Sequence, residues 1–184
     1  MKRLFAAVLF IAVSLCQADA SLDLSVFSAK GFEGKGPLEF NVPEDLLLLP
    51  DGQILVADQR NNRLQLLTAE GDFVRAIPQL LASEPVRADG KKQTSAKSLI
   101  PPKAASSSAA LEAKNKFLAE VQRYFPRPTG LALDNQGRVY VTLSESDLIA
   151  IVDIASGNVV DTLGRSGRAQ GELFGPMDID LSHD

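Results

Sequence analysis

Apolar and polar positions alternate along two separate parts of the chain. In the first part, apolar residues at a spacing of two flank the turn sequence PDG: Leu46, Leu48, Ile54 and Val56. This spacing puts them on one face of two strands, and Gly52 suits the turn because glycine adopts positive φ easily. Further strands are predicted at 63–67 and 73–77, joined by the turn AEGD. Residues 43–77 therefore predict a four-stranded antiparallel meander.

The same pattern returns 85 residues later without a gap, since Pro43 aligns with Pro128 and Gly52 with Gly137. The second copy again reads as four strands, with turns NQG and ASGN. A third copy opens at Pro176, 48 residues after Pro128, and repeats the first apolar pair as Ile179 and Leu181. Repeats of roughly 40 to 48 residues, each a four-stranded meander, are typical of β-propeller blades.

Residues 31–77 resemble an NHL repeat: a glycine-rich lead-in, an apolar strand, an Asp-Gly turn, the sequence VAD, an Asn-x-Arg element and then GDF. The second copy departs from this motif, with Leu143 for Asp58, Ser146 for Asn61 and Leu148 for Arg63. Residues 164–176, GRSGRAQGELFGP, restart it.

The resemblance implies an all-β fold of NHL-type β-propeller blades, in a family whose rings are often six-bladed. The chain supplies fewer than three blades of about 43 residues, so we expect an incomplete ring that assembles with further blades or with another chain. The predicted organisation is a signal peptide at 1–20, an N-terminal strand and first blade at 21–77, an insertion at 78–125, a second blade at 126–163 and the start of a third at 164–184.

The polar link between the second and third strands of the first blade, DQRNNR, has two interpretations. It is a catalytic or ligand-binding loop, or it is the structural joint of the blade. The resemblance favours the joint, in which Asp58, Asn61 and Arg63 bond backbone groups left unpaired by the turn, with Gly52 and Gly137 as turn residues. Arg60 and Asn62 then remain free to face a partner.

The insertion at 78–125 has two different halves. Its first half is rich in Pro, Ser, Ala and Lys. Between Arg87 and Lys103 it carries the cations Arg87, Lys91, Lys92, Lys97 and Lys103 against Asp89 alone. Its second half predicts an amphipathic helix that ends at Pro126, with one apolar face formed by Ala110, Ala113, Phe117, Val121 and Tyr124. One interpretation is a solvated loop with a helix on the propeller rim. The other is a docking element for an acidic partner or a membrane surface, in which Lys91, Lys92 and Lys97 contribute.

The first twenty residues predict export. Lys2 and Arg3 precede an apolar segment at 4–15, and Ala18-Asp19-Ala20 is a cleavage sequence of the A-x-A kind. The apolar segment is too short for a transmembrane anchor, so we expect a periplasmic or extracellular protein with no stable membrane span after processing. Cys16 follows a leucine where a lipid-attachment motif needs a small residue, and cleavage after Ala20 removes it.

Little of the chain suggests catalysis. With one histidine, His183, the chain cannot build a multi-histidine zinc site, and it lacks a G-x-S-x-G nucleophile motif. The sequence GFEGKG precedes strands rather than a nucleotide-binding helix. Asp178, Asp180 and Asp184 alternate like calcium ligands but lack the glycine and glutamate of an EF-hand loop. We therefore expect no catalytic residue, cofactor or metal in this chain, and its net charge of −4 argues against nucleic-acid binding.

Two functions remain. The favoured one is an exported NHL-repeat propeller that binds a protein or a small ligand. The alternative is a propeller enzyme, a metal-dependent lyase or lactone hydrolase, whose active site lies largely outside this chain.

Overall fold

The computed structural model describes residues 8–9, 29–78 and 108–182. The signal-peptide prediction lies outside these residues except for Val8 and Leu9, which form the two-residue strand β1 and pair with β2 (Ala29–Lys30). The predicted N-terminal strand around 22–26, the lysine-rich half of the insertion and His183 also lie outside the described residues.

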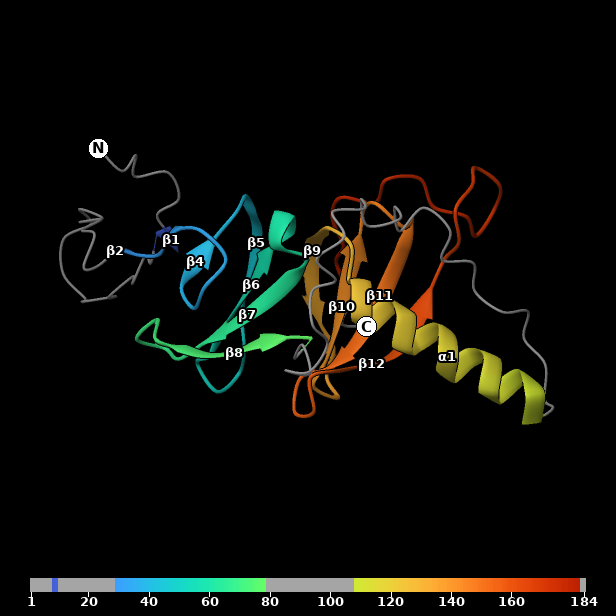
Figure 1. Cartoon of the computed structure of the whole chain (residues 1–184), viewed down its shortest axis with the longest axis horizontal. Helices are drawn as coiled ribbons and strands as arrows, with labels where there is room; N and C mark the ends of the chain where they lie inside the picture. Colours follow the sequence, from blue (N-terminus) through green and yellow to red (C-terminus); the bar gives the residue numbers. More distant parts are fainter. Residues whose placement is uncertain (1–7, 10–28, 79–107, 183–184) are drawn as a thin grey trace, which may run out of the picture.

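The described residues are mostly β-structure in two antiparallel sheets of four strands each (Figure 1). The first sheet contains β5 (Pro43–Leu48), β6 (Ile54–Asp58), β7 (Arg63–Leu67) and β8 (Phe73–Ile77). The second contains β9 (Pro128–Leu133), β10 (Arg138–Leu143), β11 (Leu148–Asp153) and β12 (Asn158–Leu163). We call residues 43–77 the first unit and residues 128–163 the second unit. The eight strands predicted for the first two copies are confirmed. The strand predicted for the third copy, at Ile179 and Leu181, is extended chain outside any sheet, and the described residues hold no closed ring.

The two units share their strand register. Leu46 pairs with Val56 as Leu131 pairs with Val141. Asp58 pairs with Arg63, and the equivalent pair 85 residues later is Leu143 with Leu148. The repeat in the sequence is therefore also a repeat in three dimensions.

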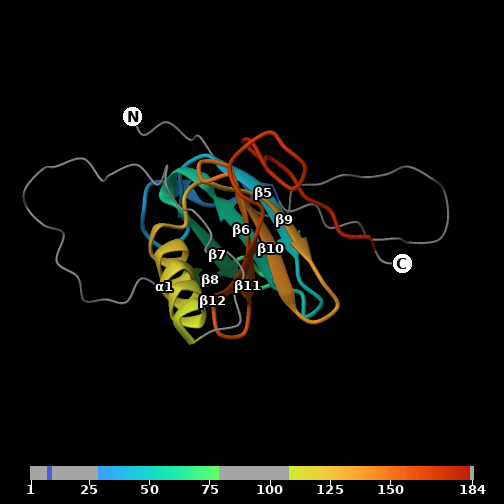
Figure 2. The ribbon, with the colours of Figure 1, turned by 90° about the vertical axis from the view of Figure 1, so that its right-hand side faces the viewer.

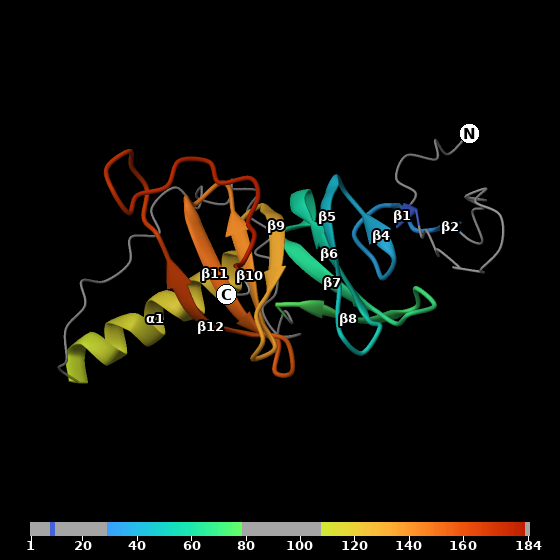
Figure 3. The same cartoon turned by 180° about the vertical axis from the view of Figure 1, so that it is seen from behind.

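A short glycine-rich loop precedes the first unit, and a similar loop follows the second unit. The lead-in loop, residues 31–42, forms the parallel pair β3 (Phe32–Glu33) and β4 (Glu39–Phe40) before entering β5. The tail, residues 164–182, repeats this geometry with a parallel bridge between Ser166 and Leu173. It then passes over the second sheet in extended form, as Figure 3 shows.

Most of the hydrophobic core lies between the two sheets. Leu55, Leu64 and Leu66 of the first unit are buried in the same cluster as Val139 and Val141 of the second. A smaller cluster covers the other face of the first sheet, where Phe40 of the lead-in loop packs on Ile54, Val56 and Leu67. That face is left open at β5, since Leu46 is 43% and Leu48 is 65% exposed.

Helix α1 (Ser108–Tyr124) lies beside β12, on the opposite side of the molecule from β5 and β9 (Figure 2). The predicted apolar face is buried only in its C-terminal half, at Phe117 and Val121, while Ala113 is exposed. Gln122 joins the helix to the edge of the second sheet. Its Oε1 accepts the Val159 amide at 3.1 Å, and its Nε2 donates to Asn158 Oδ1 at 2.9 Å.

Candidate functional site: the polar joint and its rim

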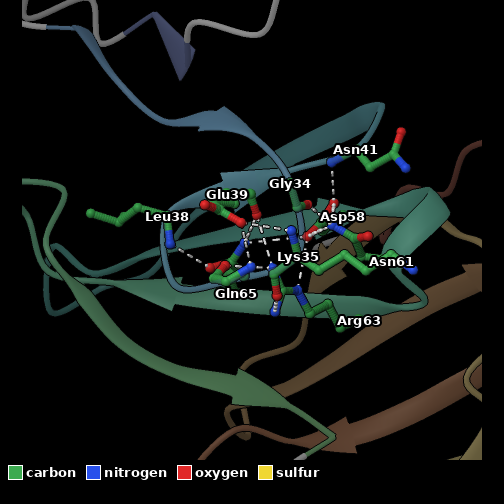
Figure 4. A network of polar contacts seen from close by, with 10 residues as sticks. Gly34, Lys35, Leu38, Glu39, Asn41, Asp58, Asn61, Arg63 and Gln65 are labelled. Atoms are coloured by element: carbon green, nitrogen blue, oxygen red, sulfur yellow. Dashed lines mark hydrogen bonds and ion pairs between the residues drawn. The ribbon is translucent and has the colours of Figure 1, made fainter.

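Four side chains at the β6–β7 corner form a cluster that holds the lead-in loop (Figure 4). We call Asp58, Asn61, Arg63 and Gln65 the polar joint. Asp58 has no exposed surface; its Oδ1 accepts the Asn41 amide at 2.7 Å, and its Oδ2 accepts Arg63 Nε at 2.8 Å. Asn61 Nδ2 donates to both oxygens of Asp58 and to the Gly34 carbonyl. A buried carboxylate is stable here because cationic and neutral donors surround it.

Arg63 binds the lead-in loop by its backbone. Its guanidinium donates to the carbonyls of Lys35, Gly36 and Glu39, each at 2.8 Å. A planar guanidinium presents several donors in a fixed arrangement, which suits three carbonyls on one loop. These contacts therefore hold the loop by its backbone and use none of the loop's own side chains.

Gln65 is the member of the polar joint that sequence reasoning missed. It is buried in β7, donates to the Glu39 carbonyl at 2.7 Å and accepts the Leu38 amide at 3.1 Å. The available signal was a glutamine between Leu64 and Leu66, where a strand buried on both faces has little room for an unbonded amide.

The second unit has apolar residues at three of the four positions of the polar joint. Leu143, Ser146, Leu148 and Ala150 stand at the positions of Asp58, Asn61, Arg63 and Gln65. Leu143, Leu148 and Ala150 are fully buried in the same cluster as Val121 and Phe125. Here α1 and Phe125 precede the unit in place of a glycine-rich lead-in. The polar residues thus occur in the unit that a loop precedes, and the apolar residues occur in the unit that the helix precedes.

Two further contacts join successive units, and both use a residue in left-handed conformation. Asn62, at φ 53°, accepts the Arg127 amide on its Oδ1 at 3.0 Å. At the equivalent position of the second unit, Asp147, at φ 56°, accepts the Gly175 amide on its Oδ1 at 2.7 Å. We call these contacts the latches. Asn62, predicted to be free for a partner, is therefore engaged between the units.

The first strands of successive units also lie side by side. Asp45 Oδ2 of β5 accepts the Leu131 amide of β9 at 2.7 Å. A Cβ added to Gly130 would stand 2.7 Å from the Asp178 Cα, so the tail passes closely over β9. Asp178 and Asp180 are exposed, and each accepts the amide of the residue that follows it.

The turn glycines predicted with the joint lie away from it, at the opposite ends of the strands. Gly52 has φ 85° and Gly137 has φ 78°, in the left-handed region where a side chain would be strained. Their amides close the turns by donating to the carbonyls of Leu49 and Asp134.

The rim around the polar joint carries cations that the joint does not use. Arg60 is exposed in the 3-10 helix η1 (Gln59–Asn61). Two further exposed cations belong to segments bonded to this corner: the Lys35 carbonyl accepts from Arg63, and the Arg127 amide donates to Asn62. Within the described ranges, none of the three forms an ion pair. We call Lys35, Arg60 and Arg127 the basic rim. The predicted partner residues Lys91, Lys92 and Lys97 lie outside the described residues.

A carboxylate braces each lead-in. Glu39 Oε2 accepts the amides of Lys35 and Gly36 at 2.8 Å, and Glu172 Oε2 accepts the Ala169 amide at 2.9 Å in the tail. The Ala169 amide lowers the pKa of Glu172 below its ordinary value; partial burial opposes this shift, and Arg165 adds to it.

The described residues carry neither a cluster of metal ligands nor a membrane-spanning helix. In residues 29–78 and 108–182, no group of three or more histidine, cysteine, aspartate or glutamate side chains is placed to hold a metal ion. In the same part of the chain, no helix is both long enough and apolar enough to cross a bilayer.

Comparison with known proteins gives structural similarity but no family. No protein-family model matches the chain. No curated protein matches it either. Among solved structures, hydrazine synthase from Kuenenia stuttgartiensis is similar with a TM-score of 0.46 and 12% sequence identity. The match covers 82% of this chain and 29% of that one, so the chain spans less than a third of that protein chain's length. At this TM-score and identity the match does not identify a family.

Proposed function

We propose that the chain is an exported interaction module built from NHL-type blades of a β-propeller, and that its basic rim is the binding face. Two units with one register, joined in sequence by the latches, support the blade assignment. The N-terminal sequence motivates export. The resemblance of residues 31–77 to an NHL repeat motivates the proposed family.

A single observation carries the choice of binding face. At the β6–β7 corner every side chain of the polar joint bonds the lead-in loop, while Arg60 beside them is exposed and has no ion pair in the described part of the chain. Lys35 and Arg127 flank it from other segments. Three unpaired cations gathered from separate segments favour an anionic ligand, such as an acidic peptide.

Binding to immobilised poly-L-glutamate tests the proposal with the full chain. We expect retention at low ionic strength that falls as salt is added, because exposed charges are screened. Arg60→Glu/Arg127→Glu should remove most of the retention. Lys116→Glu/Arg123→Glu is the matched control, since it changes the net charge equally at two exposed positions on α1. Equal loss in both variants would show that net charge, rather than the rim, governs binding.

The export part of the proposal has its own test. Protein expressed from the whole reading frame should be recovered outside the cytoplasm, and N-terminal sequencing should start at Ser21. Recovered protein that still begins with the segment containing Phe10 would contradict export by cleavage.

A further inference from the structure

The tail is folded as a second lead-in loop. Each residue of the tail lies 133 positions after its counterpart in the lead-in loop, so that Gly34 corresponds to Gly167 and Glu39 to Glu172. The same backbone bonds close both loops: Gly34 N to Phe40 O at 3.2 Å matches Gly167 N to Leu173 O at 3.0 Å. The bond from Glu39 N to Gly36 O at 3.1 Å likewise matches Glu172 N to Ala169 O at 3.0 Å.

The start of the tail is also fixed against the second unit. The latch from Asp147 holds the Gly175 amide, as Asn62 holds the amide of Arg127. Gly175 has φ 55° and Arg127 has φ 50°, so both adopt the same left-handed conformation immediately before a proline. The tail therefore adopts the lead-in conformation although no polar joint of its own is present in the described residues.

The two loops differ in whether their backbone carbonyls accept hydrogen bonds from side chains. In the lead-in loop, the carbonyls of Gly34, Lys35 and Glu39 accept from the polar joint. The equivalent carbonyls of Gly167, Arg168 and Glu172 receive no hydrogen bond from any described residue. Their loop is also more open. Phe40 is 1% exposed on the first sheet, whereas its equivalent Leu173 is only partly buried and the neighbouring Phe174 is 70% exposed.

From this geometry we infer that the tail is a preformed docking site for a four-stranded β-unit whose corner carries the spacing Asp-x-x-Asn-x-Arg-x-Gln. The Arg of that unit binds the carbonyls of Arg168 and Glu172, the Asp accepts the Phe174 amide, and the Gln accepts the Gly171 amide. Each contact has its counterpart at Arg63, Asp58 and Gln65 in the first unit. Leu173 packs on the sheet of the docked unit as Phe40 packs on β6.

The occupant is a separate unit, not a second copy of this chain. Within one copy the only residues with the required spacing, 58–65, already hold the lead-in loop, and a second copy would have to release its own loop to bind the tail. The docking unit therefore has the joint but lacks a lead-in of its own, which the tail supplies.

An extended chain tests this inference. The offset of 133 places Asp184 opposite Asp51, so a copy of residues 52–78 added after Asp184 continues the repeat in register. The inference predicts that amide exchange at Phe174 and Gly171 slows about tenfold or more relative to the original chain. In the matched control, the added copy carries leucine in place of its aspartate and arginine, as at Leu143 and Leu148, and the protection is lost.

Three results would overturn the inference: unchanged exchange at Phe174 and Gly171 in the extended chain, equal protection in the control, and concentration-dependent protection in the original chain. The last would show that a second copy is the occupant. Exchange in β9 to β12 serves as the internal reference that the remainder of the protein is folded. The inference is independent of the basic rim, so a failure to bind poly-L-glutamate leaves it intact.

Discussion

Asp58 and Arg63 are paired across two strands and have different surroundings. The carboxylate is fully buried, while 16% of the Arg63 side chain is exposed, and their ion pair measures 2.8 Å. Removal of one partner from a buried ion pair is costly because the other charge stays desolvated. The pair is also tied to the backbone of the lead-in loop, so its loss affects more than two side chains.

Arg63→Leu should lower the free energy of unfolding by about 3 kcal/mol. From the sequence alone a mild effect is predicted, because the second unit has Leu148 at the equivalent position. The structure predicts a larger effect, because the Arg63 side chain donates to three carbonyls of the lead-in loop. Urea unfolding of the full chain measures the change. Lys114→Leu is the control: its ion pair with Asp161 is half exposed, and its loss should cost less than about 0.5 kcal/mol.

The double variant Asp58→Leu/Arg63→Leu recreates the pair found at Leu143 and Leu148. We expect its cost to be smaller than the sum of the two single changes by about 1 kcal/mol or more, because no unpaired charge remains. The lead-in loop should still loosen, since the carbonyls of Lys35, Gly36 and Glu39 lose the guanidinium donor. Strictly additive costs would contradict a coupled joint.

At the scale of elements, the second unit uses a helix where the first uses a loop. Val121 and Phe125 occupy the apolar corner of the second unit, and the N-terminal half of α1 projects from the sheets (Figure 1). The helix is therefore held by its last two turns.

Phe117→Ala should lower the free energy of unfolding by about 3 kcal/mol, because Phe117 is 7% exposed and contributes to the core. Leu111→Ala is the matched control at a position that is 61% exposed, and it should change the stability by less than about 0.5 kcal/mol. Thermal unfolding distinguishes the two. Equal effects would indicate that the whole helix packs, including its projecting half.

The brace at Glu172 predicts a local dependence on pH. Its pKa is lowered in the folded chain, so the ionised carboxylate stabilises the tail fully above the ordinary glutamate pKa of about 4.3. This contribution is lost as the pH falls through the lowered value. The Ala169 amide resonance should shift over that window. In Glu172→Gln the shift should be absent, and a shift that persists there would assign it to another group.

At the scale of the whole molecule, the latches connect one unit to the next. Both acceptors belong to residues in left-handed conformation, Asn62 and Asp147, and both partners are amides of the residue before a proline, Arg127 and Gly175. Asparagine and aspartate tolerate this backbone conformation better than most residues. The latch thus combines a backbone requirement with an acceptor requirement at one position.

Two substitutions separate these requirements. Asn62→Asp keeps both the acceptor and the tolerance for positive φ, as Asp147 does, and should stay near the wild-type stability. Asn62→Gly keeps the backbone freedom and removes the acceptor, which should cost about 1 kcal/mol. Chemical unfolding of both variants measures the difference. Equal stability of the two would mean that the latch bond contributes nothing.

The strands were predictable because the apolar alternation repeats with the same spacing in both units, and the turns contain glycine where positive φ occurs. The polar corner at Asp58, Asn61 and Arg63 was predictable as a group only through the resemblance. Gln65 and the latch at Asn62 were not, because their partners are backbone amides and carbonyls distant in sequence, which leave no mark on the composition. The half-buried state of α1 also depends on tertiary packing, which the helical period does not determine.

The position of Gln122 has a consequence for how the molecule behaves in concentrated solution. The last strand of a sheet offers unpaired backbone groups, and such an edge can recruit strands from other molecules into aggregates. At β12 the Gln122 side chain occupies the Val159 amide, and the helix that carries it covers that edge. The glutamine side chain thus accepts the hydrogen bond that the backbone of a neighbouring strand would otherwise accept. We therefore expect the insertion to hinder intermolecular strand pairing at this end of β12, independently of any binding partner.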